Sequence, residues 1–300
     1  MASHSDLAKP VALVTGVQGF TGAYVSAELA SAGYRVVGLS HEAGQDTLVA
    51  DLCQRDAVAD VVAQVQPDVV VHLAAIAFVA HGDADAIYRT NVTGTRHLLE
   101  ALAALPKSPR SVLLASSANI YGNSDIELLT EEAPAAPAND YAVSKLAMEY
   151  MARLWMDRLP IVLARPFNYT GVGQSEKFLL PKIVGHFRRG ERAIELGNIE
   201  VARDFQDVRF VANAYRRLLE APAAIGATVN ICSGVAHSLM EVVRMLEGLA
   251  GYSIDVRVNP AFVRANDVLK LRGSHEKLEG LIGALDIIPL ERTLAWMYGA

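Results

Sequence analysis

Cysteine is scarce in this chain of 300 residues, which contains only Cys53 and Cys232. Two widely separated cysteines cannot form a disulfide framework or a cysteine-rich metal site, so we expect no metal and a reducing compartment, the cytoplasm. Positive charge is also in the minority, with 27 Lys and Arg against 33 Asp and Glu and a formal net charge of −6. This balance gives no general electrostatic attraction for nucleic acid or an anionic membrane.

Long hydrophobic runs are missing as well. The most apolar stretch, residues 69–80, is interrupted by His72 and is too short to span a bilayer. The first ten residues are polar and contain no apolar segment, so we expect no signal peptide. Hydrophobic residues still make up 52% of the chain, which suits one large α/β domain or two small ones.

Strand and helix patterns alternate through the first half of the chain. Apolar runs predict strands at 11–14, 35–39, 48–52, 67–75, 111–115 and 161–164. Helical patterns lie at 23–32, 56–65, 87–105 and 141–157. Such alternation predicts an α/β fold with a doubly wound parallel sheet. His72 lies on a predicted buried strand, and we expect it to be structural.

The regular alternation ends after Arg165, although a further strand is predicted at 228–231. We therefore expect a dinucleotide-binding domain formed by residues 1–167 and 203–234. A smaller substrate-binding lobe would consist of residues 168–202 and 235–300.

A glycine-rich turn follows the first predicted strand, with Gly16, Gly19 and Gly22 at three-residue spacing before a helical pattern. Glycine permits a tight turn and lets the backbone approach a pyrophosphate, while the helix N-terminus supplies N–H donors. The spacing is G-x-x-G-x-x-G, not the plain G-x-G-x-x-G pattern. This segment predicts a dinucleotide site near the start of the chain.

Tyr141 and Lys145 are four residues apart in a helical pattern, so their side chains share one face of the helix. A phenol with its ordinary pKa of about 10 is a weak base, but a neighbouring ammonium favours the phenolate. Ser117, on the segment after the predicted strand 111–115, offers a hydroxyl that can bond the same substrate oxygen. These three side chains predict a catalytic device that moves a proton onto or off a carbinol oxygen.

These motifs resemble the extended short-chain dehydrogenase/reductases that act on nucleotide sugars. The resemblance rests on residues 15–22, 51–52, 72–75, 91–94, 116–117, 121–122, 141–145 and 165–168. The second half resembles the branch of GDP-mannose dehydratases and GDP-4-keto-6-deoxy-mannose reductases at residues 167–174, 197–198, 203–205, 207–208 and 230–234. Residues 264–268 and 272–275 are most similar to the reductases. The resemblance implies a Rossmann fold and a homodimer formed through the Tyr141 helix.

Binding residues can be assigned from the motifs and the resemblance together. The expected cofactor contacts are Gly16, Gly19, Phe20, Thr21, Gly22, Ser40, His41, Asp51, Leu52, Leu73, Ala74, Ala75, Asn91, Tyr141 and Lys145. The expected substrate contacts are Ser117, Asn168, Lys182, Arg203, Arg264 and Asp267. Arginine forks suit a diphosphate. Asp51 is alternatively an ordinary strand-end residue, and Asn91 a helix cap.

The preference between NAD and NADP is determined by the residues at the end of the second predicted strand. An acidic side chain there would accept hydrogen bonds from the ribose hydroxyls of NAD. No acid occurs there before Glu42, and Ser40 and His41 can accommodate a 2′-phosphate. This favours NADP(H) over NAD(H), although no arginine lies at that point.

The reaction class depends on the two residues after Ser117. Dehydratases of this family deprotonate C5 and protonate the departing C6 hydroxyl, and they resemble one another in having acidic side chains there. Ala118 and Asn119 cannot act as general acid or base at neutral pH, which argues against a dehydratase. A reductase and a 4-epimerase both remain, as does a non-catalytic dinucleotide sensor.

The resemblance favours the reductase. It implies NAD(P)H-dependent reduction of the C4 ketone of GDP-4-keto-6-deoxy-D-mannose to GDP-D-rhamnose. Phe210, Ala265 and Asn266 depart from the pattern of this branch, which leaves the base of the nucleotide open.

Overall fold

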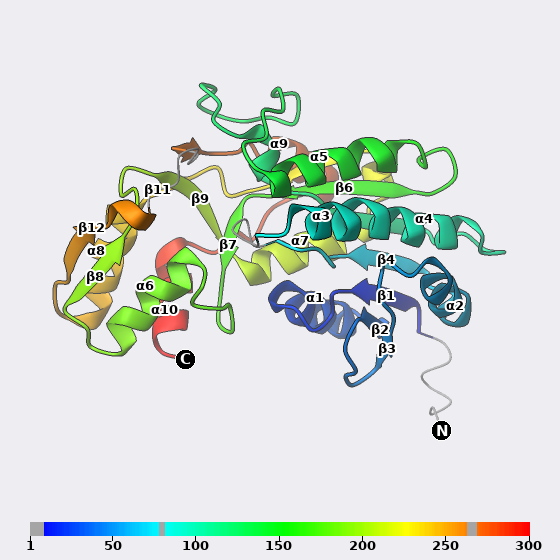
Figure 1. The fold of residues 1–300 in the computed structure, drawn as a ribbon, viewed down its shortest axis with the longest axis horizontal. Coiled ribbons are helices and arrows are strands. Elements are labelled where there is room, and N and C mark those ends of the chain that lie inside the picture. Colours follow the sequence, from blue (N-terminus) through cyan, green and yellow to red (C-terminus); the bar gives the residue numbers. More distant parts are fainter. Residues whose placement is uncertain (1–8, 78–81, 263–268) are drawn as a thin grey trace.

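The computed structural model describes residues 9–77, 82–262 and 269–300. Its largest sheet has seven strands in the order β10-β6-β5-β4-β1-β2-β3, and every neighbouring pair is parallel (Figure 1). The strands are β1 Val11–Thr15, β2 Arg35–Ser40, β3 Thr47–Val49, β4 Val69–His72, β5 Ser111–Ala115, β6 Ile161–Pro166 and β10 Thr228–Ile231. The predicted doubly wound parallel sheet is therefore confirmed.

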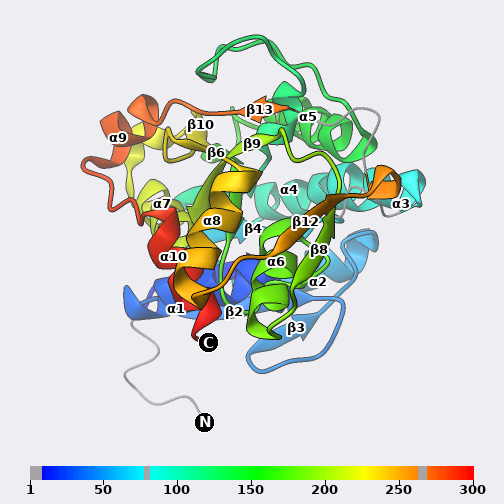
Figure 2. The ribbon, with the colours of Figure 1, turned by 90° about the vertical axis from the view of Figure 1, so that its left-hand side faces the viewer.

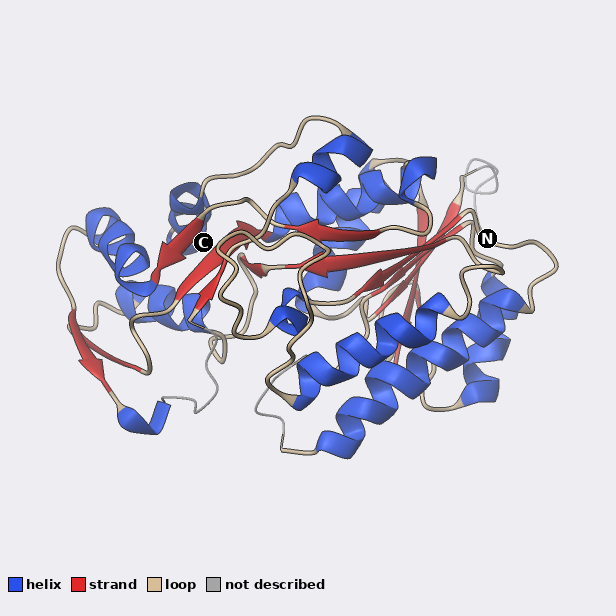
Figure 3. Ribbon diagram, turned by 90° about the horizontal axis from the view of Figure 1, so that it is seen from above, coloured by secondary structure: helices blue, strands red, loops and turns tan. Residues whose placement is uncertain are grey.

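Helices cover both faces of this sheet (Figure 3). The helices around it are α1 Phe20–Ser31, α2 Arg55–Val65, α3 Ala84–Tyr88, α4 Thr95–Ala103, α5 Asp140–Arg153, α7 Val208–Glu220 and α9 Glu276–Ile282. One buried apolar core includes Leu29 of α1 and Leu218 of α7, and another includes Val58 of α2, Leu98 of α4 and Met148 of α5. The strand order reverses between β1 and β4, and such switch points are where α/β sheets bind ligands.

A third apolar core is formed by the later part of the chain. It includes residues of α6 Leu179–Arg188, β8 Ala193–Leu196, β9 Ala202–Asp207, α8 Leu239–Ala250 and α10 Leu290–Tyr298. Figure 2 shows its helices α6, α8 and α10 side by side. Strand β12 Asp255–Val258 pairs with β8, while β11 Ala236–Ser238, β13 Lys270–Leu271 and β7 Asn168–Thr170 pair with β9. These short elements explain why the regular alternation ends after β6.

The long helix expected at 87–105 is interrupted. Helix α3 runs into a π-helical turn at Arg89–Gly94, which continues directly into α4. In this turn the Asn91 side chain accepts a hydrogen bond from the Ile76 N–H (2.9 Å) and donates one to the Ile76 carbonyl (3.2 Å). Asn91 is therefore no helix cap; the side chain that caps α3 is that of Asp83.

Other element boundaries differ by a few residues from the sequence expectation. Strand β4 ends at His72, so the following residues, predicted to continue the strand to 75, leave the sheet. Helix α1 begins at Phe20 and not at residue 23, because Gly19 already provides its N-cap. The early start brings the first turn of α1 next to the glycine-rich turn.

Candidate active site

A cavity of about 500 Å³ lies at the carboxyl ends of the central strands. Its walls come from the glycine-rich turn, the segments after β4, β5 and β6, helix α5, and the chain leading into α6. The lining residues are Gly16, Gly19, Phe20, Thr21, Gly22, Leu73, Ala75, Ala77, Ala115, Ser116, Ser117, Ala118, Asn119, Tyr141, Lys145, Pro166, Phe167, Asn168, Tyr169, Gly173, Gln174, Ser175, Phe178 and Leu271. The cavity thus occupies the switch point of the sheet.

The glycine-rich turn fits a dinucleotide. Gly16 has a φ of +69°, and a Cβ atom added to it would lie 2.9 Å from the Cα atom of Ala74. Only glycine suits this conformation and this close approach of two backbones. Gly19 caps α1 without a side-chain hydrogen bond, so the first-turn N–H groups are not occupied by a capping side chain. Such a helix N-terminus is suited to a pyrophosphate.

The three predicted catalytic side chains meet in the cavity. Tyr141 lies in the first turn of α5, which Asn139 caps by accepting a hydrogen bond from the Ala142 N–H (2.9 Å). The Tyr141 hydroxyl is hydrogen-bonded to Ser117. The ammonium nitrogen of Lys145 lies 6.0 Å from the centre of the Tyr141 ring. This arrangement can hold a carbonyl oxygen between two hydroxyls.

Burial sets the protonation of this group. It raises the pKa of Tyr141 well above its ordinary value, against the opposing effect of the hydrogen bond with Ser117. Burial also lowers the pKa of Lys145 to about 8, while the charge of Glu149 acts in the opposite direction. At neutral pH Tyr141 is therefore a neutral phenol that can donate a proton, and Lys145 is mostly charged.

The described part of the cavity wall lacks acidic groups. Among the described residues that line it, there is no Asp, Glu or His, and the two positions after Ser117 are Ala118 and Asn119. Of the described lining residues, only Tyr141, Lys145 and Tyr169 have side chains that titrate. The described wall therefore contains one proton-transfer group, formed by Ser117, Tyr141 and Lys145. It contains no second acid–base pair of the kind that elimination across C5 and C6 requires.

Tyr169 is a site residue that the sequence reasoning missed. Its hydroxyl is hydrogen-bonded to the Thr21 hydroxyl (2.8 Å), and its ring stacks on Phe20 at 6.3 Å between centroids. It thereby connects β7 to the first turn of α1. The signal in the sequence was an aromatic residue directly after Asn168.

The expected cofactor-choice residues lie beside the glycine-rich turn but do not line the cavity. The Ser40 hydroxyl donates to the side chain of Gln18 (3.0 Å), whose amide donates to the carbonyls of Glu42 and Ala43. His41 is exposed. Gln18, which sequence reasoning also missed, therefore fixes the loop that follows β2.

Four other expected cofactor residues do not line the cavity. Ala74 packs against Gly16, whereas Asp51 is exposed and Leu52 is buried against Gly94. Asn91 is 1% exposed, and its amide also donates to the Ser144 hydroxyl (3.0 Å). These residues support neighbouring backbone, and any direct contact with a cofactor stays a prediction.

His72 has the environment expected of a structural histidine. Its two ring nitrogens are hydrogen-bonded to the hydroxyls of Thr15 (2.7 Å) and Thr95 (2.8 Å). Burial lowers the pKa of His72 to about 3, so the ring is neutral. It joins β1 and α4 behind the glycine-rich turn.

The expected substrate residues are divided between three places. Asn168 lines the cavity. Lys182 donates to the Glu195 carbonyl (2.9 Å) and lies 4.6 Å from the centre of the Phe262 ring, while Arg203 donates to the Ala202 carbonyl (3.1 Å). Neither cation lines the cavity. Arg264 and Asp267 lie outside the described residues.

The described residues offer neither a metal site nor a membrane-spanning helix. No group of three metal-ligating side chains occurs there. No helix in the described part of the chain has the length and apolar character needed to cross a membrane.

Comparison with known proteins identifies relatives along nearly the whole chain. A sequence model of the NAD dependent epimerase/dehydratase family matches residues 12–232. GDP-6-deoxy-D-talose 4-dehydrogenase of Aggregatibacter actinomycetemcomitans is 33% identical over 274 residues, which cover 90% of each protein. GDP-6-deoxy-D-mannose reductase of Pseudomonas aeruginosa is 34% identical over 294 residues, covering 94% of this chain and 93% of the relative.

Solved structures give the same grouping. A Burkholderia cenocepacia chain provisionally described as an epimerase is 51% identical, with a TM-score of 0.91 and 97% of each chain covered. The structure of RMD from Pseudomonas aeruginosa complexed with NADPH is 31% identical, with a TM-score of 0.84 and 97% of each chain covered.

Proposed function

Since the chain belongs to the NAD dependent epimerase/dehydratase family and is an NAD(P)-dependent enzyme acting on nucleotide sugars, we propose that it reduces a C4 ketone. The substrate would be GDP-4-keto-6-deoxy-D-mannose and the product GDP-D-rhamnose. The observation that carries this proposal is the cavity wall, which combines Ser117, Tyr141 and Lys145 with no carboxylic acid among its described residues. Reduction needs no further acid or base.

The mechanism follows from the protonation of these side chains. A bound nicotinamide supplies the hydride for C4. Ser117 and Tyr141 hold the C4 oxygen, and Tyr141, neutral in the buried site, donates its proton to it. The Lys145 ammonium then stabilises the phenolate that remains, by the ordinary effect of a nearby opposite charge on a pKa.

The cofactor proposal is NADP(H) in preference to NAD(H). It is supported by the absence of an acid at the end of β2, where Ser40 bonds Gln18, and by the NADPH in the Pseudomonas aeruginosa structure. A comparison of kcat/KM for NADH and NADPH tests it: the proposal requires the larger value for NADPH.

The substrate proposal assigns the nucleotide to the lobe formed by residues 168–202 and 235–300. Asn168, Lys182, Arg264 and Asp267 of this lobe would bind it together with the adjoining Arg203, and the cations would meet the diphosphate. The GDP-sugar names of the two curated relatives support a guanine nucleotide.

The assembly proposal is a homodimer formed through α5. This helix exposes the side chains of Val143 and Tyr150, and its C-cap residue Leu154 is 81% exposed. Sedimentation at micromolar concentration should give twice the chain mass, and a monomer would contradict the proposal. We also propose a cytoplasmic location, which two free thiols suit.

The test of the reaction is incubation with GDP-4-keto-6-deoxy-D-mannose and NADPH while the nicotinamide absorbance is followed. Wild-type protein should consume NADPH, and Tyr141→Phe should lower kcat by roughly 10²–10⁴-fold because the proton donor is lost. Tyr34→Phe is the matched control: it removes a hydroxyl that bonds Arg110 outside the cavity and should leave kcat unchanged. No loss of absorbance with wild-type protein would refute the proposal.

The second candidate is a nucleotide-sugar 4-epimerase, which the provisional description of the Burkholderia cenocepacia relative favours. It uses the same three side chains but returns the hydride to the sugar. Interconversion of two nucleotide sugars without net NADPH consumption would support it. Tight NADPH binding with no turnover on a panel of keto sugars would instead support a sensor.

A further inference from the structure

Helix α5 is hydrogen-bonded to two consecutive residues at the end of strand β5. The Lys145 ammonium donates to the Ala115 carbonyl (2.7 Å), and the Ser116 hydroxyl donates to the Glu149 carboxylate (2.6 Å). Lys145 and Glu149 are one helix turn apart, so both reach the same short piece of backbone. The next residue along that backbone is Ser117.

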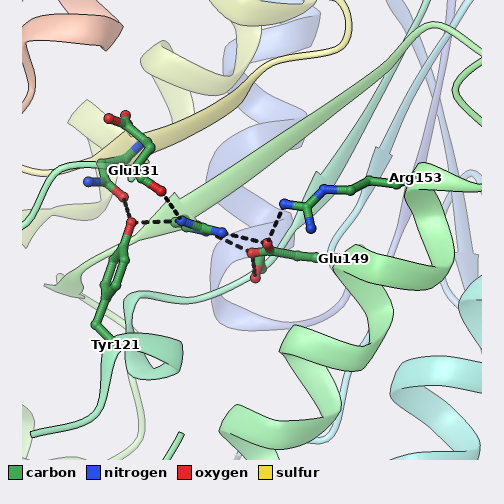
Figure 4. Close-up of polar contacts among 7 residues, drawn as sticks. Tyr121, Glu131, Glu149 and Arg153 are labelled. Carbon is green, nitrogen blue, oxygen red and sulfur yellow. Dashed lines mark hydrogen bonds and ion pairs between the residues drawn. The ribbon is translucent and has the colours of Figure 1, made fainter. Parts of the chain in front are cut away.

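Glu149 is held firmly from its other side. It is fully buried, and both of its oxygens accept hydrogen bonds from the guanidinium of Arg165 (2.9 and 2.7 Å). Arg165 also donates to the Tyr121 hydroxyl (2.9 Å) and to the Glu131 carbonyl (3.1 Å). Figure 4 shows Glu149 on its helix, with Tyr121 and Glu131 at the far end of this network. A bidentate pair of this kind fixes the orientation of the carboxylate.

We propose that Glu149 is a positioning residue: with Lys145 it clamps residues 115–116 so that the Ser117 hydroxyl stays opposite Tyr141, and its negative charge keeps Lys145 protonated. This extends the proposed reduction to a residue that does not line the cavity. The carboxylate acts only through Ser116 and Lys145 and touches no reacting atom.

The electrostatic role of Glu149 follows from the positions of the charges around it. Lys145 is 4% exposed and its pKa is already lowered by burial, so it stays charged only with help from a nearby anion. Glu149 is that anion. The guanidinium of Arg165 is permanently charged and forms an ion pair with the same carboxylate. Without the carboxylate, Arg165 would be an uncompensated buried cation, and a second cation at Lys145 would be disfavoured further.

The other titratable groups near Lys145 do not replace Glu149. On its own helix Tyr141 is neutral, Tyr150 is exposed, and Asp140 is exposed and accepts a hydrogen bond from the Tyr88 hydroxyl (3.0 Å). From β4 the neighbour is His72, which burial also keeps neutral. Arg153 contacts Glu149 at 3.4 Å from the exposed side of the helix and is itself cationic. Among these groups Glu149 alone is a buried anion.

The direct test is an NMR titration of the ligand-free protein labelled with ¹³C at the lysine ε-carbons. The Lys145 signal, assigned from its loss in Lys145→Met, should titrate at lower pH in Glu149→Gln than in wild type. The isosteric amide keeps an acceptor for Ser116. Glu100→Gln is the matched control because it breaks ion pairs with Arg55 and Arg96 away from the cavity, and it should leave the signal unchanged. An unchanged Lys145 titration in folded Glu149→Gln would overturn the electrostatic role.

The positioning role is tested by Ser116→Ala, which removes one hydrogen bond and keeps every charge. Loss of this bond should lower kcat for the keto sugar about tenfold or more, because small misplacements of a catalytic group are costly. The pH at which activity declines should be unchanged. A kcat equal to wild type in folded Ser116→Ala would overturn the positioning role, even if Glu149→Gln fails to fold. Since the titration needs no substrate, failure of the proposed reaction and failure of this inference are distinguishable.

Discussion

The alkaline limb of the activity profile is a quantitative consequence of the burial of Lys145. Burial lowers the pKa of Lys145 to about 8, whereas the pKa of Tyr141 is raised well above its ordinary value. Between pH 7 and pH 9.5 the proton donor therefore stays protonated and only Lys145 changes charge. If the ammonium stabilises the phenolate, kcat for reduction follows the protonated fraction of Lys145 and falls as the pH rises.

The size of the effect follows from that pKa. With a pKa of about 8, Lys145 is charged in about nine-tenths of molecules at pH 7, about half at pH 8 and about one-tenth at pH 9. We therefore expect kcat at pH 9 to be about one-tenth of its value at pH 7. The assay is the initial rate of NADPH oxidation at saturating keto sugar, measured across this range.

Lys145→Arg provides the internal control for this prediction. Its guanidinium stays charged throughout the range, because arginine is not deprotonated in proteins. The variant should have a lower kcat, since the geometry differs, but no alkaline limb. A flat wild-type profile between pH 7 and pH 9.5, or an unchanged limb in Lys145→Arg, would refute the reasoning.

Three further outcomes are expected. Lys145→Met should stabilise the folded protein at pH 7 by about 2 kcal/mol. The shift of the Lys145 pKa from 10.5 to about 8 costs the wild-type protein about 3 kcal/mol of stability, and the variant escapes this cost. The variant also loses the hydrogen bond to the Ala115 carbonyl, which is worth about 1 kcal/mol. Because the folded-state pKa is the lower one, this gain is complete below about pH 8 and should shrink by pH 10, as urea unfolding at both pH values would show. Gly16→Ala should abolish the thermal stabilisation that NADPH gives, because residue 16 has a positive φ and the added methyl group would meet the backbone of Ala74. Retained stabilisation would contradict the role of the glycine-rich turn in cofactor binding. Tyr169→Phe should raise the Kd for NADPH several-fold by releasing Thr21 (about 1 kcal/mol), and an unchanged Kd by calorimetry would remove Tyr169 from the site.

Local patterns were sufficient for the sheet and for the centre of the cavity. The run 11–14 and the glycines after it specify a strand and a tight turn from neighbouring residues alone, and the i, i+4 spacing fixes Tyr141 beside Lys145. Strands β5 and β10 have the predicted limits. These features depend on short-range chemistry that a sequence displays directly.

The remainder depends on contacts between distant segments. The π-helical turn forms because Asn91 bonds Ile76, a contact that helical periodicity does not encode. Tyr169 becomes a site residue only when β7 brings it to Thr21, across 148 positions of the chain. Glu149 reads as an ordinary helical residue until Arg165 of β6 is placed against it.

The central claim is reduction at C4, and reduction with deuterium-labelled NADPH tests it most directly. Protein, GDP-4-keto-6-deoxy-D-mannose and NADPH carrying deuterium at the transferred position should give GDP-D-rhamnose with one deuterium at C4 for each NADP⁺ formed, as read by NMR and mass spectrometry. GDP-6-deoxy-D-talose, the C4 epimer, would contradict the proposed product. A nucleotide sugar formed without deuterium and without NADP⁺ would contradict reduction itself.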